Sequence, residues 1–427
     1  MQAAVRSPKR LTGTITPPGD KSISHRAAIF NAISDGEARI ENYGPGADCQ
    51  STLRVLQALG TEIDGKGSSF NIRGGALHEP SDVLHTGNSG TTTRLMAGVL
   101  AGQSFMSVMT GDRSIRSRPM GRIIDPLRLM GAMVDGRESG RLAPLTFRGG
   151  ALRGIEYQLP VASAQLKSAL LLAGLFADGE TVLNQPALSR DHTELMFRAM
   201  GAEVIEDGLS VSVRPARLRA VDVKIPADIS SAAYWIVAAV CHPDAEITVM
   251  GVGTNPTRTG ILDALQAMGA DLSIINERIE GGEQVADVVA RSSALRATEI
   301  AGDLIPRLVD EVPVLALAAC FARGTTLIKD ASELRVKESD RLQATAKELR
   351  RMGAAVEELD DGLRITGGHA LVGASCRSYG DHRIAMTLGI AGLLASGETT
   401  IAAAETAAIS YPSFWRDLAS FEGGVTT

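Results

Sequence analysis

Apolar and polar positions follow one another along the chain in a succession of blocks that returns six times. In each copy, an apolar stretch of helical length is followed by a short polar turn and by the β-branched residues that open a strand. The turns read DGEARI (35–40), AGQSF (101–105), DGETVL (178–183), PDAEITV (243–249), RGTTLI (323–328) and SGETTI (396–401). The 427 residues therefore divide into six repeats of about 71 residues each.

A second, amphipathic helix recurs in the same rhythm and ends at a glycine, which suits a helix C-terminus. These endings read ALGTEI (58–63), LMGAMV (129–134), AMGAEV (199–204), AMGADL (267–272) and RMGAAV (351–356). A closing strand reads FNIRGG (70–75), LTFRGG (145–150) or LRITGG (363–368). Each repeat is thus predicted to run strand, helix, strand, helix, strand, strand. The sixth copy lacks the Met-Gly-Ala ending, and we expect its last helix over 411–421.

Repeats of this kind cannot bury their sheets alone, so they should group around shared cores. Three repeats per core predict an α/β protein of two similar lobes. We expect residues 17–226 in lobe 1, and residues 1–16 with 227–427 in lobe 2. The hinge would lie near Pro226, and a strand over 10–16 would cross to lobe 2. A cleft between two lobes is where a small-molecule site is expected.

Composition and charge narrow the classes of function. The formal net charge is −6, which argues against a nucleic-acid or anionic-membrane binder. The N-terminal stretch lacks a signal-peptide core, and the apolar run 312–322 is about half of the ~20 residues that cross a bilayer. We therefore expect a cytoplasmic protein. Four distant cysteines and histidines without ligand spacing indicate reduced thiols and no metal site.

Polar residues gather where the first helix of each repeat begins. PGDKSISHR (18–26) places Lys21, Ser22 and Arg26 at such a start, where free N–H groups favour phosphate or carboxylate. HTGNSGTTTR (85–94) repeats the arrangement around Gly90, and GDRSIRSRPMGR (111–122) adds four arginines, among them Arg118. A capped surface helix, a tight turn and solvated charges are the simpler alternatives.

Four further segments and the single residue Asp310 complete this set. VASAQLKS (161–168) and SRDHTE (189–194) supply small polar groups, and Asp310 precedes an apolar helix. ELRVKESDRL (333–342) strings charges together in a pattern that is usually a solvated helix face. YGDHR (379–383) precedes the apolar helix 384–394. Cations, hydroxyls and carboxylates at matching positions of the repeats predict a site for anionic substrates and acid–base chemistry.

In this order, PGDKSISHR, GNSGTTTR, RPMGR, SAQ, RVKESDR and GDHR resemble the 5-enolpyruvylshikimate-3-phosphate synthases along the whole chain. SAQ in place of SSQ is similar to the class II-like bacterial branch. The resemblance implies two lobes of three βαβαββ units each, an inside-out α/β barrel. It also implies transfer of the enolpyruvyl group of phosphoenolpyruvate to the 5-hydroxyl of shikimate-3-phosphate, with release of phosphate. The resemblance further implies that the enzyme needs no cofactor or metal, that it is a monomer, and that glyphosate inhibits it.

The resemblance also implies residue roles. Shikimate-3-phosphate would be held by Lys21, Ser22, Arg26, Ser163, Gln165, Ser189, Asp310 and Lys337. Phosphoenolpyruvate would be held by Lys21, Gly90, Arg118, Gln165, Arg341 and Arg383. Asp310 would accept the proton of the attacking hydroxyl, and Glu338 with Lys21 would move the proton of the methylene carbon. Two positions depart from the family pattern: Ile409 replaces a common Lys, and Glu333 replaces a common Asn.

Three alternatives share part of this pattern. A UDP-N-acetylglucosamine enolpyruvyl transferase would carry a reactive Cys in the loop GDRSIRSRP (111–119), which has none. An RNA 3′-terminal phosphate cyclase would need a nucleotide-accepting His and a nucleic-acid surface, which the acidic balance disfavours. A catalytically inactive sensor of phosphorylated metabolites is disfavoured by the presence of Asp310, Glu338 and Lys21.

Overall fold

The strands follow one recurring order. The computed structural model describes residues 1–421 and 425–426, and in this part of the chain the strands form six four-stranded sheets. The second repeat shows the pattern, with order β6-β7-β9-β8, a parallel first pair and two antiparallel pairs. Its elements are β6 (Leu84–His85), α3 (Gly90–Ala101), β7 (Met106–Thr110), η1 (Ile115–Ser117), α4 (Gly121–Leu129), β8 (Val134–Gly136), α5 (Arg137–Gly140) and β9 (Leu142–Arg148). The predicted βαβαββ repeat is confirmed.

The first and third repeats lie with the second in one compact unit, lobe 1, of residues 19–225 and 280–282. The first has α1 (Lys21–Ala32), β3 (Glu37–Glu41), α2 (Ala47–Ala58), β4 (Glu62–Lys66) and β5 (Ser69–Arg73). Its leading strand is β14 (Val223–Lys224), which pairs in parallel with β3. The third has β10 (Glu156–Gln158), α6 (Ala164–Gly174), β11 (Thr181–Asn184), α7 (His192–Ala199), β12 (Val204–Asp207) and β13 (Ser210–Val213).

Lobe 2 comprises residues 1–18, 226–279 and 283–427 as a second compact unit. Its fourth repeat has α8 (Ile229–Cys241), β15 (Ala245–Gly253), α9 (Gly260–Ala267), β16 (Asp271–Glu280) and β17 (Glu283–Arg291). The fifth has β18 (Glu299–Ile300), α10 (Leu304–Leu308), α11 (Val312–Phe321), β19 (Thr325–Ile328), η2 (Ser332–Val336), α12 (Arg341–Arg351), β20 (Ala355–Glu358) and β21 (Leu363–Thr366). The sixth has β22 (Ser375–Arg377), α13 (His382–Leu394), β23 (Glu398–Ala402), η3 (Ala404–Ile409), α14 (Phe414–Ala419) and β24 (Val425–Thr426).

The N-terminal segment completes two sheets of lobe 2. β2 (Leu11–Ile15) pairs in parallel with β15, so the strand predicted over 10–16 does belong to the second lobe. β1 (Gln2–Arg6) pairs antiparallel with β23 and supplies a strand of the sixth sheet. The last helix, predicted over 411–421, is shorter than expected. Residues 411–413 lie outside α14 because Tyr411 precedes Pro412, which disfavours a helical backbone at Tyr411. Tyr411 is buried, and its hydroxyl accepts a hydrogen bond from Trp235 Nε1 at 3.3 Å.

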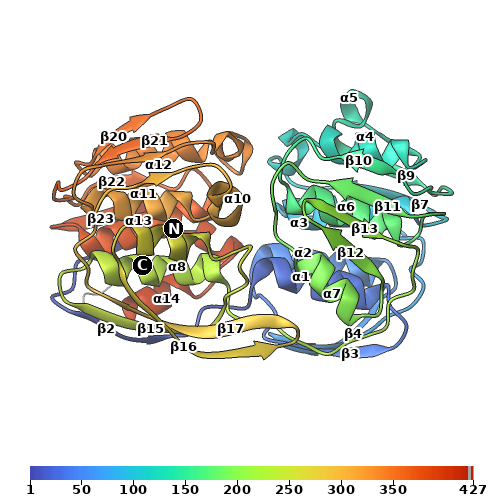
Figure 1. Cartoon of the computed structure of the whole chain (residues 1–427), viewed down its shortest axis with the longest axis horizontal. Coiled ribbons are helices and arrows are strands. Elements are labelled where there is room, and N and C mark those ends of the chain that lie inside the picture. The colour runs from blue at the N-terminus through green and yellow to red at the C-terminus, as the bar shows by residue number, and fades with distance from the viewer. Residues whose placement is uncertain (422–424, 427) are drawn as a thin grey trace. The chain divides into compact units, whose positions relative to one another are not determined.

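The first helices of the repeats form the cores. Figure 1 shows α8, α11 and α13 side by side within lobe 2, and α3 beside α6 within lobe 1. All twelve residues of α3 are buried, as are nine of the ten residues of α11. Helices buried on every side are apolar all around, which explains why these stretches show no polar face. Only their ends remain available for polar groups.

Close packing between α3 and α6 depends on Gly98. A Cβ atom on Gly98 would lie 2.1 Å from the carbonyl oxygen of Ala169 and 3.0 Å from its Cα atom. Because the obstacle is helix backbone, it cannot swing aside, and the two helices would have to separate.

We therefore expect Gly98→Ala to lower the free energy of unfolding by about 3 kcal/mol or more, since overpacking a helix interface forces backbone shifts. Gly75→Ala is the matched control, because a Cβ on Gly75 meets nothing within 4 Å. Urea denaturation of both variants measures the difference. Equal midpoints for the two proteins would contradict this account of the core.

Candidate active site

Side-chain caps close most of the central helix starts. In lobe 1, the caps are Asp20 for α1, Ser89 for α3 and Ser163 for α6, each accepting a backbone N–H of the first turn. In lobe 2, Asp228 and Asp381 cap α8 and α13 in the same way. The remaining N–H groups and the positive end of each helix dipole stay available for an anion.

The start of α1 carries three of the predicted residues. Lys21 is partly exposed, and its Nζ lies 3.2 Å from Asp48 Oδ2 on α2. Ser22 accepts a hydrogen bond from Arg190 Nη1 through its Oγ at 3.3 Å. Arg26, by contrast, is 2% exposed. Its guanidinium donates to Ser22 O, Ser168 Oγ and Thr193 Oγ1 at 2.9, 2.7 and 2.8 Å. Arg26 therefore ties the first turn of α1 to α6 and α7.

The starts of α3 and α6 are joined by side-chain hydrogen bonds. Gln165 Oε1 accepts from Arg94 Nη1 at 2.7 Å, and Gln165 Nε2 donates to Thr91 Oγ1 at 2.9 Å. Gly90, the first residue of α3, faces arginine: a Cβ there would lie 2.8 Å from Arg94 Nη1 and 3.0 Å from Arg118 Nη1. Gly90, Gln165 and Arg118 are therefore brought together at the starts of α3 and α6.

Two further predicted residues of lobe 1, Ser163 and Ser189, belong to the third repeat, as Gln165 does. Ser163 is buried at the start of α6 and accepts from Leu166 N at 3.4 Å. Ser189 is 5% exposed, and its Oγ donates to Gln185 Oε1 at 2.7 Å. Arg190 follows it and contacts Ser22, as described above. Hydroxyls, an amide and cations thus surround the starts of α1, α3 and α6.

In lobe 2, Arg341 brings three carboxylates together. It is the first residue of α12 and is 2% exposed. Its Nε donates to Asp381 Oδ2 at 2.9 Å, Nη1 donates to Asp310 Oδ1 at 3.2 Å, and Nη2 donates to Glu338 Oε2 at 2.7 Å. Although burial alone would lower the pKa of Arg341, the charges of Asp381, Glu338 and Asp310 raise it above its usual value. Arg341 is therefore a permanent cation flanked by both predicted catalytic carboxylates.

Arg383 is a second buried cation in the same lobe. It is 2% exposed at the start of α13, and no residue in 1–421 or 425–426 provides a hydrogen-bond partner for its Nε or Nη1. Although burial alone would lower the pKa of Arg383, the neighbouring Tyr234 and the carboxylates Asp310 and Asp228 raise it above its usual value. The side chain therefore stays charged. A buried charge with unused donors is costly unless an anion satisfies it. Arg383 is thus suited to an anionic ligand.

The two departures from the family pattern also have defined places. Glu333 lies in η2, and its Oε1 accepts a hydrogen bond from Lys337 Nζ at 2.9 Å. The predicted substrate residue Lys337 is therefore ion-paired within its own segment. Ile409 ends η3 and is partly buried, so it supplies no cation at that position.

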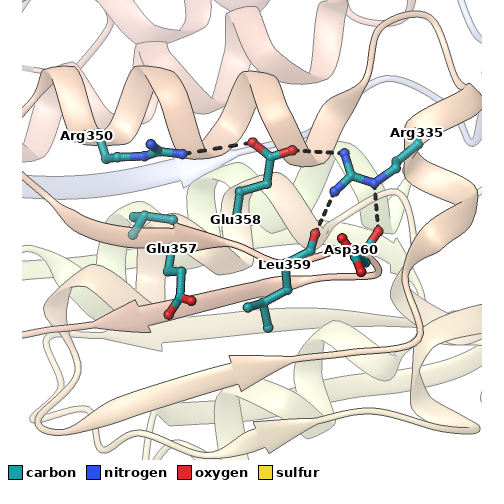
Figure 2. A pocket seen from close by; sticks show the side chains of 7 residues that line it. Arg335, Arg350, Glu357, Glu358, Leu359 and Asp360 are labelled. Atoms are coloured by element: carbon teal, nitrogen blue, oxygen red, sulfur yellow. Dashed lines mark hydrogen bonds and ion pairs between the residues drawn. The ribbon is translucent and has the colours of Figure 1, made fainter.

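A solvated helix face, the simpler alternative for segment 333–342, does not describe Arg335 in the structure. The segment ELRVKESDRL is no single helix: η2 covers its first part, and α12 begins at Arg341. Figure 2 shows Arg335 reaching over the β20–β21 turn. It donates to Asp340 Oδ2 and Glu358 Oε1, and to the carbonyls of Leu359 and Asp360, at 2.6–2.9 Å. Because Asp340 caps α12, Arg335 holds the segment that carries Lys337, Glu338 and Arg341.

The hollow beside Arg335 adds no second site. The shallow hollow in Figure 2, lined by Arg335, Arg350 and Glu357–Asp360, has its arginines occupied by carboxylates and carbonyls. In the described part of the chain, no three His, Cys, Asp or Glu side chains are placed to hold a metal ion. No helix among these residues is long and apolar enough to span a membrane.

Two α/β lobes with buried arginines, paired carboxylates and hydroxyls at their helix starts are typical of an enzyme for small anionic substrates. The family model of EPSP synthase (3-phosphoshikimate 1-carboxyvinyltransferase) matches residues 5–418. The chain is 57% identical over 417 residues to the 3-phosphoshikimate 1-carboxyvinyltransferase of Gloeobacter violaceus, covering 96% of each chain. For the enzyme of Herpetosiphon aurantiacus, the identity is 53% over 429 residues, 99% of this chain and 100% of the relative.

Solved structures agree with these relatives. The EPSP synthase of Acinetobacter baumannii superposes with a TM-score of 0.88 and 42% identity over the whole of both chains. The enolpyruvyl transferase NikO of Streptomyces tendae has a TM-score of 0.81 over all of this chain and 98% of its own, but at 20% identity it shows the fold alone. The chain belongs to the EPSP synthase family, and it is an enolpyruvyl transferase of the shikimate pathway.

Arg335 allows a direct test of the site geometry. Arg335→Gln should lower kcat roughly 10-fold or more, because catalytic groups displaced by about 1 Å lose their alignment. Arg335→Lys should not restore it, since an ammonium cannot bridge two carboxylates and two carbonyls. Phosphate release measures the rate, and Arg364→Gln, at an exposed ion pair with Glu357 on the same hairpin, is the control. Normal kcat in a well-folded Arg335→Gln protein would refute the positioning role.

Proposed function

We propose that the charged helix starts of the two lobes together catalyse the addition of shikimate-3-phosphate to phosphoenolpyruvate and the elimination of phosphate. The 5-hydroxyl oxygen attacks C2 of phosphoenolpyruvate while C3 takes up a proton, and the tetrahedral product then loses phosphate and a C3 proton. These steps need a base for the hydroxyl proton, a group that delivers and later removes the C3 proton, and several fixed cations. The observation that carries the proposal is Arg341, which contacts Asp310 and Glu338 at once.

Arg341 also explains how the donor would prepare the site. Its Nε edge is held by Asp381, so the fork of Nη1 and Nη2 faces Asp310 and Glu338. A carboxylate binds such a fork in a bidentate manner. When the carboxylate of phosphoenolpyruvate takes this place, it replaces the contacts to the two acids. They are then free to exchange protons with the reacting atoms.

The roles of the individual groups follow from their chemistry. Asp310 takes the proton of the 5-hydroxyl, and Glu338 with Lys21 moves the C3 proton. Arg383 provides unused, buried N–H donors for the donor's anionic groups, with Arg118, Gly90 and Gln165 as their counterpart in lobe 1. That the two sets face one cleft stays a prediction.

The acceptor is proposed to bind at the starts of α1 and α6. Lys21, Ser22, Ser163, Gln165 and Ser189 offer a cation, hydroxyls and an amide for a phosphorylated polyol. To these the geometry adds Arg190, whose guanidinium lies against Ser22. Arg26 holds the start of α1 in place through its hydrogen bonds to Ser22, Ser168 and Thr193. Lys337 would have to break its ion pair with Glu333 to bind the substrate. A cytoplasmic location and a monomeric state remain predictions from the sequence.

The proposed base can be tested by substitution. Asp310→Asn should lower kcat by roughly 10²–10⁴-fold while the affinity for shikimate-3-phosphate changes little, as expected when a general base is lost. Phosphate release gives kcat, and calorimetric titration gives the affinity. Asp303→Asn is the control, because Asp303 is an exposed carboxylate seven residues earlier. Near-normal turnover of Asp310→Asn would show that another group takes the proton.

Gly90 should affect the binding of the inhibitor glyphosate more than the binding of phosphoenolpyruvate. The methyl of Gly90→Ala would press on Arg94 and Arg118 at the ends of their side chains, so the helix is spared but the guanidinium groups must shift. The longer inhibitor should lose more from this narrowing than the compact phosphoenolpyruvate. We expect the inhibition constant for glyphosate to rise far more than KM for phosphoenolpyruvate. Equal changes in the two constants, measured by competition kinetics, would show that this wall does not discriminate.

A further inference from the structure

A buried polar layer joins α1, α6 and α7 beneath the proposed acceptor site. One part of it is Arg26 with Ser168 and Thr193, whose hydroxyls lie 2.6 Å apart. The neighbouring residues in sequence, Lys167 and Glu194, extend the layer with a charged pair. Neither residue touches a group to which the proposed reaction assigns proton transfer.

The charged pair is fully enclosed. The side chains of Lys167 and Glu194 are 1% and 2% exposed, and Lys167 Nζ lies 2.5 Å from Glu194 Oε1. Lys167 Nζ also donates to the carbonyl oxygen of Ser189 at 3.2 Å. Within residues 1–421 and 425–426, Glu194 Oε2 has no hydrogen-bond partner. A single ammonium therefore links the first turn of α6, the first turn of α7 and the loop between β11 and α7.

Stability alone does not account for this arrangement. An apolar pair of the same volume is often as stable as a buried ion pair or more so, because both charges must leave water. Burial raises the pKa of Glu194, although the charge of Lys167 lowers it, so the ionised carboxylate is held there at a cost. An apolar pair, however, has no N–H to donate to the carbonyl of Ser189.

That carbonyl belongs to the loop whose Ser189 hydroxyl and Arg190 guanidinium are proposed to bind the acceptor. Ser189 Oγ is turned toward Gln185 Oε1, and Arg190 Nη1 contacts Ser22 Oγ. A phosphate bound by Ser189 and Arg190 would pull on this loop. Lys167 holds the loop through the Ser189 carbonyl, and Glu194 holds Lys167.

We propose that Lys167 and Glu194 are positioning residues for the phosphate of the acceptor, acting through the backbone of Ser189. The proposal rests on the proposed function, in which this loop binds shikimate-3-phosphate. It predicts that loss of the pair weakens binding of the phosphorylated acceptor while the donor site and the proton-transfer groups keep their function.

The decisive variant removes both charges and keeps the volume. Lys167→Met with Glu194→Leu should melt close to the wild-type temperature, whereas Lys167→Met alone should melt about 5 °C or more lower, because it leaves a buried unpaired carboxylate. The double variant should raise KM for shikimate-3-phosphate about 10-fold or more, as loss of a hydrogen bond to a binding loop allows. KM for phosphoenolpyruvate and kcat should change less than about twofold.

A conservative variant covers the case in which the double variant folds poorly. Glu194→Gln keeps the shape and an acceptor for Lys167 Nζ, so KM for shikimate-3-phosphate should rise by a smaller, intermediate factor. A purely structural role would lower the melting temperature and leave both KM values alone. An unchanged KM for shikimate-3-phosphate in a folded double variant, or in Glu194→Gln if only that protein folds, overturns the proposal.

Ser189→Ala separates this inference from the proposed function. If Ser189→Ala raises KM for shikimate-3-phosphate and the charge variants do not, the loop binds the acceptor but the buried pair does not position it. If Ser189→Ala also leaves this KM unchanged, the acceptor does not bind at the loop. The assignment of the acceptor site then fails, together with the inference built on it.

Discussion

Complete burial of the central helices is the constraint on which the structure depends. A βαβαββ repeat covers only part of its first helix, so three repeats must share a core, and α3 and α11 are enclosed along nearly their whole length. Helices without a polar face can present chemistry only at their ends. The N-terminal ends offer free N–H groups and a positive dipole, which favour anions. The same packing that buries the helices therefore creates a place for phosphate and carboxylate groups.

The helix starts of the two lobes carry different groups. Lobe 1 surrounds its helix starts with hydroxyls, an amide and cations, and fixes them from below through Arg26 and its partners on α6 and α7. Lobe 2 concentrates charge around Arg341, where three carboxylates contact one guanidinium. The first arrangement suits recognition of a phosphorylated alcohol, and the second suits proton transfer beside an anionic donor. A transferase with two anionic substrates needs both.

The sequence predicted the repeat, the strand over 10–16 and most of the helix starts because these depend on local periodicity and turn residues. It did not predict which charges pair across the fold. Lys21 meets Asp48, Arg341 meets Asp381, and Arg335 meets Glu358, all across 23–40 residues of chain. Such pairs depend on how helices and turns pack. The charge string 333–342 matches a solvated face for this reason, since alternating signs alone do not show which charges will pair across the fold.

Acceptor specificity tests the central claim most directly, namely that these helix starts bind a phosphorylated shikimate beside phosphoenolpyruvate. The measurement is phosphate release from phosphoenolpyruvate by the wild-type chain, with shikimate-3-phosphate or UDP-N-acetylglucosamine as acceptor, and with the enolpyruvyl product identified by mass spectrometry. The account predicts one phosphate per enolpyruvyl ether with shikimate-3-phosphate and no turnover with the nucleotide sugar. Turnover with the nucleotide sugar, or no product with shikimate-3-phosphate, would contradict it.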